Sequence, residues 1–214
     1  MQLHRGGRFR AWLGHRLGGD AEVGGRVGRR ILHAAGAFTL LYYLFPPHLL
    51  GITPNWTIPL AALVAVLTLD GLRLSGRIDV PETRPYERIR LASYSYFGIA
   101  IVLSLLLFPE PIAVATILGT AFVDPLIGEL RRSATLRAMY PLVPFAAYFG
   151  LATVALAEVG RFPLVMAGFL AALAGALAIA GEYPHWIYLD DDLVMTVLPG
   201  IVLWGLVLAW PGIH

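Results

Sequence analysis

The stretch LGTAFVDPLIGELRR, Leu118 to Arg132, begins as an apolar run and ends in charged residues. Asp124 stands directly before Pro125 inside the apolar part. A carboxylate in a membrane segment costs a few kcal/mol and usually faces a protein interior or a wet cavity. Proline removes one helical hydrogen bond, which a membrane helix tolerates where protein or water satisfies the freed groups. We therefore expect a membrane span that breaks at Pro125 and lines a polar pocket.

The composition of the whole chain agrees with a membrane span at this place. Hydrophobic residues make up 57% of the 214 residues and charged residues 14%, and the mean hydropathy is +0.70. An ordinary globular domain has about 25% charged residues. The apolar residues also fall into blocks near the roughly 20 residues that cross a bilayer. We expect an all-α, polytopic integral membrane protein.

Two missing residue types exclude several kinds of chemistry. The chain contains no cysteine, so it forms neither a disulfide nor a thiolate metal site. Its 16 basic residues are all arginine, because the sequence contains no lysine. A lysine Schiff base and a P-loop lysine are therefore excluded.

Seven segments have the length and apolarity of a membrane span: 31–50, 57–74, 91–108, 111–130, 140–157, 163–180 and 193–210. Pro46 and Pro47 can end the first of them early. Residues 1–28 form a basic tail, which is either a short helix on an anionic membrane surface or a disordered segment. Residues 29–214 form a single transmembrane domain.

The arginines are distributed unequally along the chain. Seven lie in the N-terminal tail, five between the second and third spans, three between the fourth and fifth, and only Arg161 remains. With seven spans, all but Arg161 lie on one side of the membrane. Positive charge gathers on the cytoplasmic side of membrane proteins, so we expect a cytoplasmic N-terminus.

Ionisable residues of both signs gather at the cytoplasmic ends of these spans. Carboxylates can hold Mg²⁺ through their oxygen atoms, and arginines can hold phosphate oxygens. Such a pairing suits phosphoryl or nucleotidyl transfer, in which positioning and charge neutralisation dominate. The candidates are Arg29, Arg30, His33, Asp70, Arg73, Asp124, Arg131, Arg132, Glu182, Asp190, Asp191 and Asp192.

Each group also has an interpretation that needs no ligand. The basic pair at 29–30 can anchor the topology, and His33 can be an interfacial histidine. Asp70 and Arg73 can simply pair with each other at i, i+3. The acidic run at 190–192 can be a solvated loop, or it can complement the N-terminus of the last helix.

The order of these motifs resembles the CTP-dependent lipid kinases, such as dolichol kinase and phytol kinase, which are related to the phosphatidate cytidylyltransferases. RRILH (29–33) is similar to that family's basic pair with a following histidine. DGLR (70–73) is similar to its acid-x-x-Arg at the end of the second span. SYSYFGIAIVLSLLLFP (93–109) resembles its third span, which contains Tyr and Gly.

Two further motifs resemble the family with one substitution each. FVDPLIG (122–128) resembles its Gly-Asp-Pro segment, with Val123 in place of Gly. Glu182 and DDDLVMTVLPG (190–200) resemble its acidic stretch near the end, with Asp192 in place of Asn. The family's Lys-Ser/Thr-x-Glu-Gly loop motif is missing, because the corresponding region reads ELRRSATLRAMYPLVP.

The resemblance implies that Mg²⁺ and CTP bind at the cytoplasmic face and that the γ-phosphate passes to the hydroxyl of an isoprenoid or related lipid. It implies metal and nucleotide coordination by Asp124, Asp191 and Asp192, with Asp70 and Glu182 in the same catalytic pocket. The phosphate-binding candidates are Arg29, Arg30, His33, Arg73, Arg131 and Arg132. We expect a multi-pass protein of the cell membrane whose partners are a lipid alcohol and a nucleotide, and not a nucleic acid.

Three alternatives stay open on the sequence alone. A related cytidylyltransferase would form a CDP-lipid, although the signature expected near the C-terminus of that family is absent. A non-catalytic relative would bind lipid, nucleotide or a membrane partner. A transporter would also suit the Gly- and Ala-rich span AGFLAALAGALAIAG, which favours close helix packing.

Overall fold

The computed structural model describes residues 21–49, 51, 53–78, 80, 87, 89–182 and 190–210, with the side chains of 21–29 and 49 left out. Over these residues the chain is all-α, as the sequence predicts, apart from one very short hairpin. The α-helices are α2 (Ala21–Phe38), α3 (Thr57–Leu74), α4 (Ser93–Leu107), α5 (Glu110–Arg132), α6 (Leu142–Glu158), α7 (Leu164–Glu182) and α8 (Asp191–Ala209). The 3₁₀ segments η1 (Thr39–Leu44) and η3 (Arg137–Met139) and the hairpin β1 (His48–Leu49) and β2 (Thr53–Pro54) complete the described elements.

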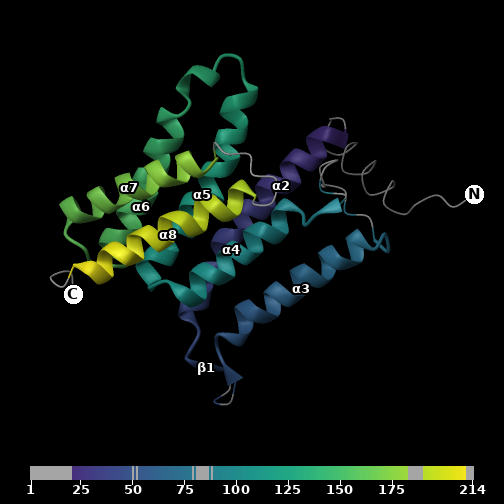
Figure 1. The fold of residues 1–214 in the computed structure, drawn as a ribbon, viewed down its shortest axis with the longest axis horizontal. Coiled ribbons are helices and arrows are strands. Elements are labelled where there is room, and N and C mark those ends of the chain that lie inside the picture. Colours follow the sequence, from purple (N-terminus) through teal and green to yellow (C-terminus); the bar gives the residue numbers. More distant parts are fainter. Residues whose placement is uncertain are drawn as a thin grey trace, which may run out of the picture.

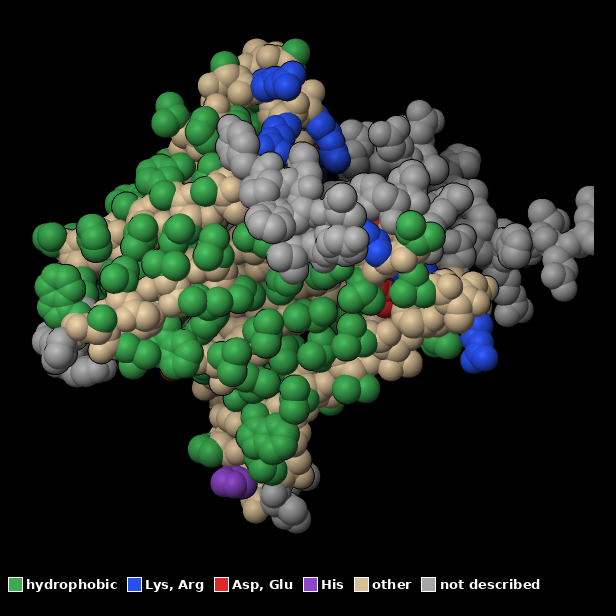
Figure 2. All heavy atoms as spheres, in the orientation of Figure 1, with side chains coloured by type: hydrophobic (Ala, Val, Ile, Leu, Met, Phe, Trp, Pro, Cys, Tyr) green, Lys and Arg blue, Asp and Glu red, His purple; other side chains and the backbone are tan. Residues whose placement is uncertain are grey.

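Four of these helices are long and apolar enough to cross a membrane: α3, α5, α7 and α8. Helices α4 and α6 are apolar but shorter. Large hydrophobic side chains lie exposed on the outer surface, for example Val165 at 88% and Val64 at 64%. Figure 2 shows them covering much of one face of the molecule. A soluble monomer rarely exposes so much contiguous apolar surface, so the structure is consistent with a membrane protein.

The first predicted span differs from the structure at both ends. Helix α2 begins at Ala21, inside the predicted basic tail, and gives way to the 3₁₀ segment η1 at Thr39. The Thr39 hydroxyl donates a hydrogen bond to the Gly36 carbonyl at this change of helix type. Pro46 and Pro47 follow η1, and neither proline can donate a helical hydrogen bond. Residues 1–20, including most of the predicted tail, lie outside the described part, and the number of spans stays a prediction.

Helix α5 lies at the centre of the bundle and contacts α2, α4, α6, α7 and α8. Its side chains Ile112, Ile117 and Val123 are fully buried or nearly so. Helix α3 packs on α4 at the outer edge, as Figure 1 shows. Much of α5 is therefore buried against other helices, although Phe122 is 48% exposed.

Glycine lets two pairs of helices approach each other closely. A Cβ on Gly119 of α5 would collide with the ring of Tyr148 on α6. A Cβ on Gly36 of α2 would collide in the same way with the ring of Phe97 on α4. Small residues at such contacts are typical of helix packing in membranes.

The predicted break at Pro125 is wrong in one respect. Helix α5 continues through Pro125 as far as Arg132. Pro125 has no N–H to donate to the carbonyl of Ala121, and its ring crowds that carbonyl. The helix nevertheless continues, and Ala121, Val123 and Ile127 on either side of this position pack in the buried core.

Candidate functional site

The structure brings His33, Asp124 and Asp192 together from three helices, α2, α5 and α8. The Nε2 atom of His33 lies 3.4 Å from Oδ2 of Asp124 and 3.8 Å from Oδ2 of Asp192. One ligand atom from each residue lies within 4.8 Å of the other two. The arrangement follows from the fold, because α2 and α8 both pack against the central helix α5. We call these three residues the acid–histidine cluster.

Two buried polar atoms of this cluster have no hydrogen-bond partner among the described residues. They are Nδ1 of His33 and Oδ1 of Asp192, and both side chains are almost completely buried. A buried polar atom without a partner costs about 1–3 kcal/mol. Such a cost is explained when a ligand or a cation completes the hydrogen bonding or coordination of the group.

A set of three carboxylates overlaps the acid–histidine cluster. Oxygen atoms of Asp190, Asp191 and Asp192 also lie within 4.8 Å of one another. Asp190 caps α8 by accepting from the backbone N–H of Asp192, and it accepts from Arg90 at 3.3 Å. Asp192 belongs to both sets.

The donor atoms of the two sets fit a divalent cation. The carboxylate oxygens suit Mg²⁺ or Mn²⁺. The predicted metal ligands divide between the sets: Asp124 and Asp192 share the acid–histidine cluster, and Asp191 and Asp192 share the acidic run.

Ser93, at the start of α4, contacts the acidic run and also the segment before α4. Its hydroxyl donates to Asp192, and it also lies 3.3 Å from Oδ1 of Asp190. Its backbone N–H donates to the Glu87 carboxylate at 3.2 Å. Ser93 therefore links the beginning of α8 to the segment that precedes α4.

Asp70 and Arg73, at the end of α3, pair with each other as one interpretation of the sequence predicts. Asp70 accepts three further hydrogen bonds, each of 2.9 Å, from the Ala92 N–H and the Tyr94 and Ser95 hydroxyls. The other nitrogens of the Arg73 guanidinium donate to the carbonyls of Glu87 and Arg90, at 2.7 and 2.8 Å.

We call this group the Asp70–Arg73 cluster. The four acceptor positions of its carboxylate are all used. This arrangement favours a positioning role, in which the cluster holds the segment before α4. That Asp70 is catalytic and Arg73 binds phosphate stays a prediction.

Arg131 and Glu182 form a separate ion pair of 2.6 Å between α5 and α7. Tyr140 accepts from Arg131 and donates to Glu182, at 3.0 Å in both cases. The Arg131 guanidinium also lies 4.6 Å from the centre of the Tyr140 ring. Burial, followed by the nearby Glu182 carboxylate, raises the pKa of Tyr140 from its ordinary value near 10 to about 12. The hydroxyl therefore stays protonated at neutral pH and can donate.

The remaining predicted arginines lie nearer the surface. Arg30 pairs with Glu129, and Arg132 lies 3.6 Å from the same carboxylate. The side chains of Arg30 and Arg132 are 46% and 52% exposed, so both can reach a ligand from solution. Arg29 lies on α2, but its side chain is outside the described part of the structure.

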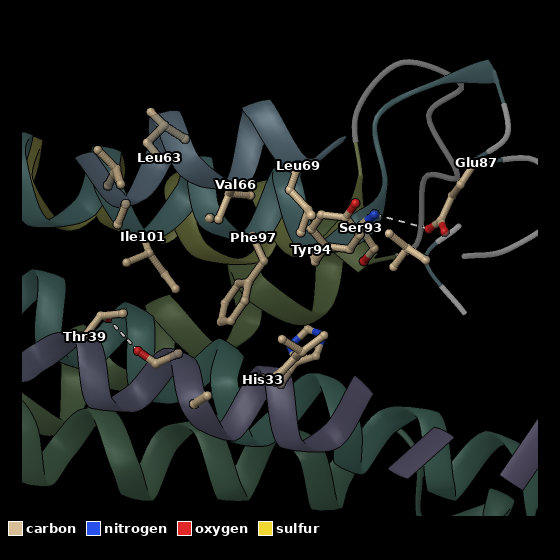
Figure 3. A pocket seen from close by; sticks show the side chains of 17 residues that line it. His33, Thr39, Leu63, Val66, Leu69, Glu87, Ser93, Tyr94, Phe97 and Ile101 are labelled. Atoms are coloured by element: carbon tan, nitrogen blue, oxygen red, sulfur yellow. Dashed lines mark hydrogen bonds between the residues drawn. The ribbon is translucent and has the colours of Figure 1, made fainter. Parts of the chain in front are cut away.

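A groove of about 350 Å³ lies between α2, α3 and α4. Apolar side chains form most of its lining, among them Leu63 and Val66 of α3. In Figure 3, Phe97 and Ile101 reach into it from α4, and the ring of Phe97 stacks on that of His33. The groove ends at polar residues, because its lining includes His33 and Ser93. His33 therefore belongs both to the lining of the apolar groove and to the acid–histidine cluster.

The sequence predictions missed several residues of this site. Ser93, Tyr94 and Ser95 lie in the SYSYFG motif, which the sequence comparison uses only as a family marker. Their position at the start of the span that follows DGLR, on the same predicted side of the membrane, is the signal that could have assigned them to the site. Tyr140 carries no such signal, because it stands alone before a proline.

We compared the chain with known families, proteins and structures. No protein-family model, curated protein or solved structure matches this chain. The resemblance to the CTP-dependent lipid kinases therefore rests on the sequence motifs alone.

Proposed function

We propose that the protein is a CTP-dependent kinase that transfers the γ-phosphate to the hydroxyl of an isoprenoid or related lipid. One observation carries this proposal: His33 lines the end of an apolar groove and also belongs to a buried cluster with two carboxylates. A lipid alcohol has the matching chemistry, because a hydrocarbon chain fits the groove and its hydroxyl reaches the polar end. Phosphoryl transfer needs few covalent partners from the protein, since positioning and charge neutralisation dominate.

The proposal includes seven spans with the N-terminus and the site on the cytoplasmic side of the cell membrane. The distribution of arginines supports this orientation. Arg73 ends α3, Arg131 and Arg132 end α5, Arg90 precedes α4 and Arg30 lies within α2. Each of them contacts an acid of the same region. Arg161 lies in the connection between α6 and α7.

In this proposal Asp124, Asp191 and Asp192 would hold Mg²⁺, and the two overlapping sets of donors fit that role. When bound, Mg²⁺ would neutralise negative charge on the phosphates of CTP. The Oδ1 atom of Asp192 has no hydrogen-bond partner among the described residues, which supports the proposal that a cation binds there.

His33 is placed to handle the proton of the acceptor. It lines the groove, and its Nε2 atom lies near both Asp124 and Asp192. As the acceptor oxygen forms its bond to the γ-phosphorus, the bond to the β-phosphate oxygen breaks and CDP leaves. The hydroxyl proton would pass to His33 as general base, which the neighbouring carboxylates would stabilise in its charged form.

Arg30 and Arg132 are the best placed arginines for the nucleotide. Both are half exposed and share the Glu129 carboxylate, so a phosphate group could replace that partner. Arg131 is held more firmly by Glu182 and Tyr140. We propose that Arg30 and Arg132 contact the phosphates and that Arg131 holds the end of α5 in place.

A labelling experiment tests the proposed function. Membranes containing the protein are incubated with Mg²⁺ and CTP labelled at either the α or the γ phosphate, with polyprenols, phytol or diacylglycerol as acceptors. Label that passes to a polyprenol or phytol from the γ position alone supports the kinase, and excess unlabelled ATP should compete weakly. Label from the α position supports a CDP-lipid-forming cytidylyltransferase. CTP binding without transfer to any acceptor supports a non-catalytic relative, and both of these results would overturn the kinase.

A further inference from the structure

The groove between α2, α3 and α4 has two different ends. Thr39 and Ile101 lie at one end and His33, Ser93 and Glu87 at the other, as Figure 3 shows. Between them the lining is apolar. The volume of about 350 Å³ is near the lower limit of the roughly 300–1,000 Å³ typical of small-molecule sites. A molecule that fills it should be slender, apolar over most of its length and polar at one end.

The groove is open to the outside along two of its walls. Leu32 and Ala35 of α2 and Ala62 and Leu69 of α3 line it and are also exposed. The surface around this opening is apolar, because the outer face of α3 exposes Val64 and other hydrophobic side chains. A ligand would therefore enter sideways, between α2 and α3, from an apolar medium.

The polar end of the groove is shared with the candidate catalytic site. His33 lines the groove and belongs to the acid–histidine cluster. Ser93 lines it too and donates its hydroxyl to Asp192. A hydroxyl group at this end would lie beside the residues that bind the cation in the proposed function.

We infer that this groove is the binding site for the acceptor's chain. It admits one linear hydrocarbon chain from the bilayer, between α2 and α3, and places the terminal hydroxyl at His33 and Ser93. The inference rests on the proposed function and adds the substrate class: an alcohol with one chain, as opposed to a diacylglycerol with two.

Photolabelling tests this site without requiring catalysis. The protein is placed in phosphatidylcholine nanodiscs without nucleotide and exposed to a linear isoprenoid alcohol that carries a diazirine. Mass spectrometry should place the label on α2, α3 and α4 at the groove. An excess of unlabelled linear alcohol should remove the labelling, whereas diacylglycerol and added phosphatidylcholine should not.

Two neighbouring alanines give a matched pair of variants. Ala61 and Ala62 are both exposed on α3, but only Ala62 lines the groove. Ala62→Phe should reduce the labelling at least about tenfold, because a misfit of only one methylene in an apolar pocket already costs about ten- to 200-fold and a phenyl ring is larger. Ala61→Phe should leave the labelling unchanged. Ala35→Phe fills the groove from the opposite wall and should reproduce the effect of Ala62→Phe, which separates blocking from a folding defect of α3.

The possible outcomes separate the two proposals. Equal labelling of the Ala61→Phe and Ala62→Phe proteins would contradict the proposal that the groove binds the alcohol. Label elsewhere in the fold would contradict it too. Competition by phosphatidylcholine as strong as that by the alcohol would mean a bilayer lipid only, and would also overturn it. Specific labelling of the groove in a protein that transfers no phosphate from CTP would overturn the kinase and leave the groove as a lipid-alcohol site.

Discussion

The acid–histidine cluster and the Asp70–Arg73 cluster contain similar residues but differ in how fully their polar atoms are used. Asp70 and Asp192 are both completely buried carboxylates. Asp70 accepts four hydrogen bonds from within the protein, one of them from Arg73. Asp192 has one oxygen without a partner among the described residues and lies beside other carboxylates. A buried charge whose partners are complete fixes structure, whereas one left incomplete is available to a ligand.

The largest effect should come from breaking the complete cluster. Arg73→Met leaves Asp70 buried without its charged partner, which should lower the free energy of unfolding by about 3–5 kcal/mol. Reversible unfolding in mixed micelles measures this change. Arg77→Met, at an exposed arginine four residues later, is the control and should change stability by less than about 0.5 kcal/mol. If Arg73→Met folds normally but loses all transfer, Arg73 belongs to the reaction and the comparison fails.

The next effect concerns activity and not stability. Asp124→Asn should lower the rate of γ-phosphate transfer by about 100- to 1,000-fold, the usual cost of removing one group that stabilises transition-state charge. Membrane insertion should be normal, since the amide has the same size as the carboxylate. Glu158→Gln, at an exposed acid that ends α6, serves as the matched control and should keep full activity. Normal transfer by the Asp124→Asn protein would remove Asp124 from the site.

A third test compares the two clusters by their response to a cation. Mg²⁺ at 100 times its dissociation constant should stabilise the native protein by about 2.7 kcal/mol. Asp192→Asn should abolish this shift in thermal unfolding. Without metal, the same variant should be as stable as the native protein or more stable, because one of several neighbouring negative charges is removed. Asp70→Asn should instead lower the stability of the protein, both with and without Mg²⁺. Metal-free destabilisation by both variants would show that Asp192 is as structural as Asp70.

The smallest effect should be at Tyr140. Tyr140→Phe removes the hydroxyl between Arg131 and Glu182 and should cost about 1 kcal/mol of stability. Because the pKa of Tyr140 in the folded protein is about 12, above its ordinary value near 10, its contribution should be complete below pH 10. It should be lost as the pH rises toward 12, where the stabilities of the native and Tyr140→Phe proteins converge. If the difference in stability between the native and Tyr140→Phe proteins stayed constant from pH 10 to pH 12, the protonated Tyr140 hydroxyl would not be its source.

The sequence predicted the apolar helices well because their signal is local. Blocks such as 164–182 are apolar on every side, so their helical state does not depend on their neighbours. The first span was predicted less well, since α2 begins among glycines and arginines that carry no apolar signal. Helix α5 was predicted to break at Pro125, but it continues to Arg132 while it packs on five neighbouring helices.

The site was predicted by residue type but not by role. His33, Asp70, Asp124 and Asp192 were all candidates, and the sequence offered no way to divide them into two clusters. That division depends on which donors surround each carboxylate. For Asp70 these donors come from residues 92–95, across a connection whose length hides the contact.

The close contact between Gly36 and Phe97 gives a rule for recognising relatives of this chain. Phe97 occupies the space that any side chain at position 36 would need, and its ring also stacks on His33. Evolution can therefore enlarge position 36 only if position 97 becomes smaller, and that change would remove the support of the histidine. Gly119 and Tyr148 form a second pair under the same constraint. The two pairs are 61 and 29 residues apart in the chain. We expect each pair to covary among distant homologues, in which a larger residue at the glycine position should accompany a smaller one at the aromatic position.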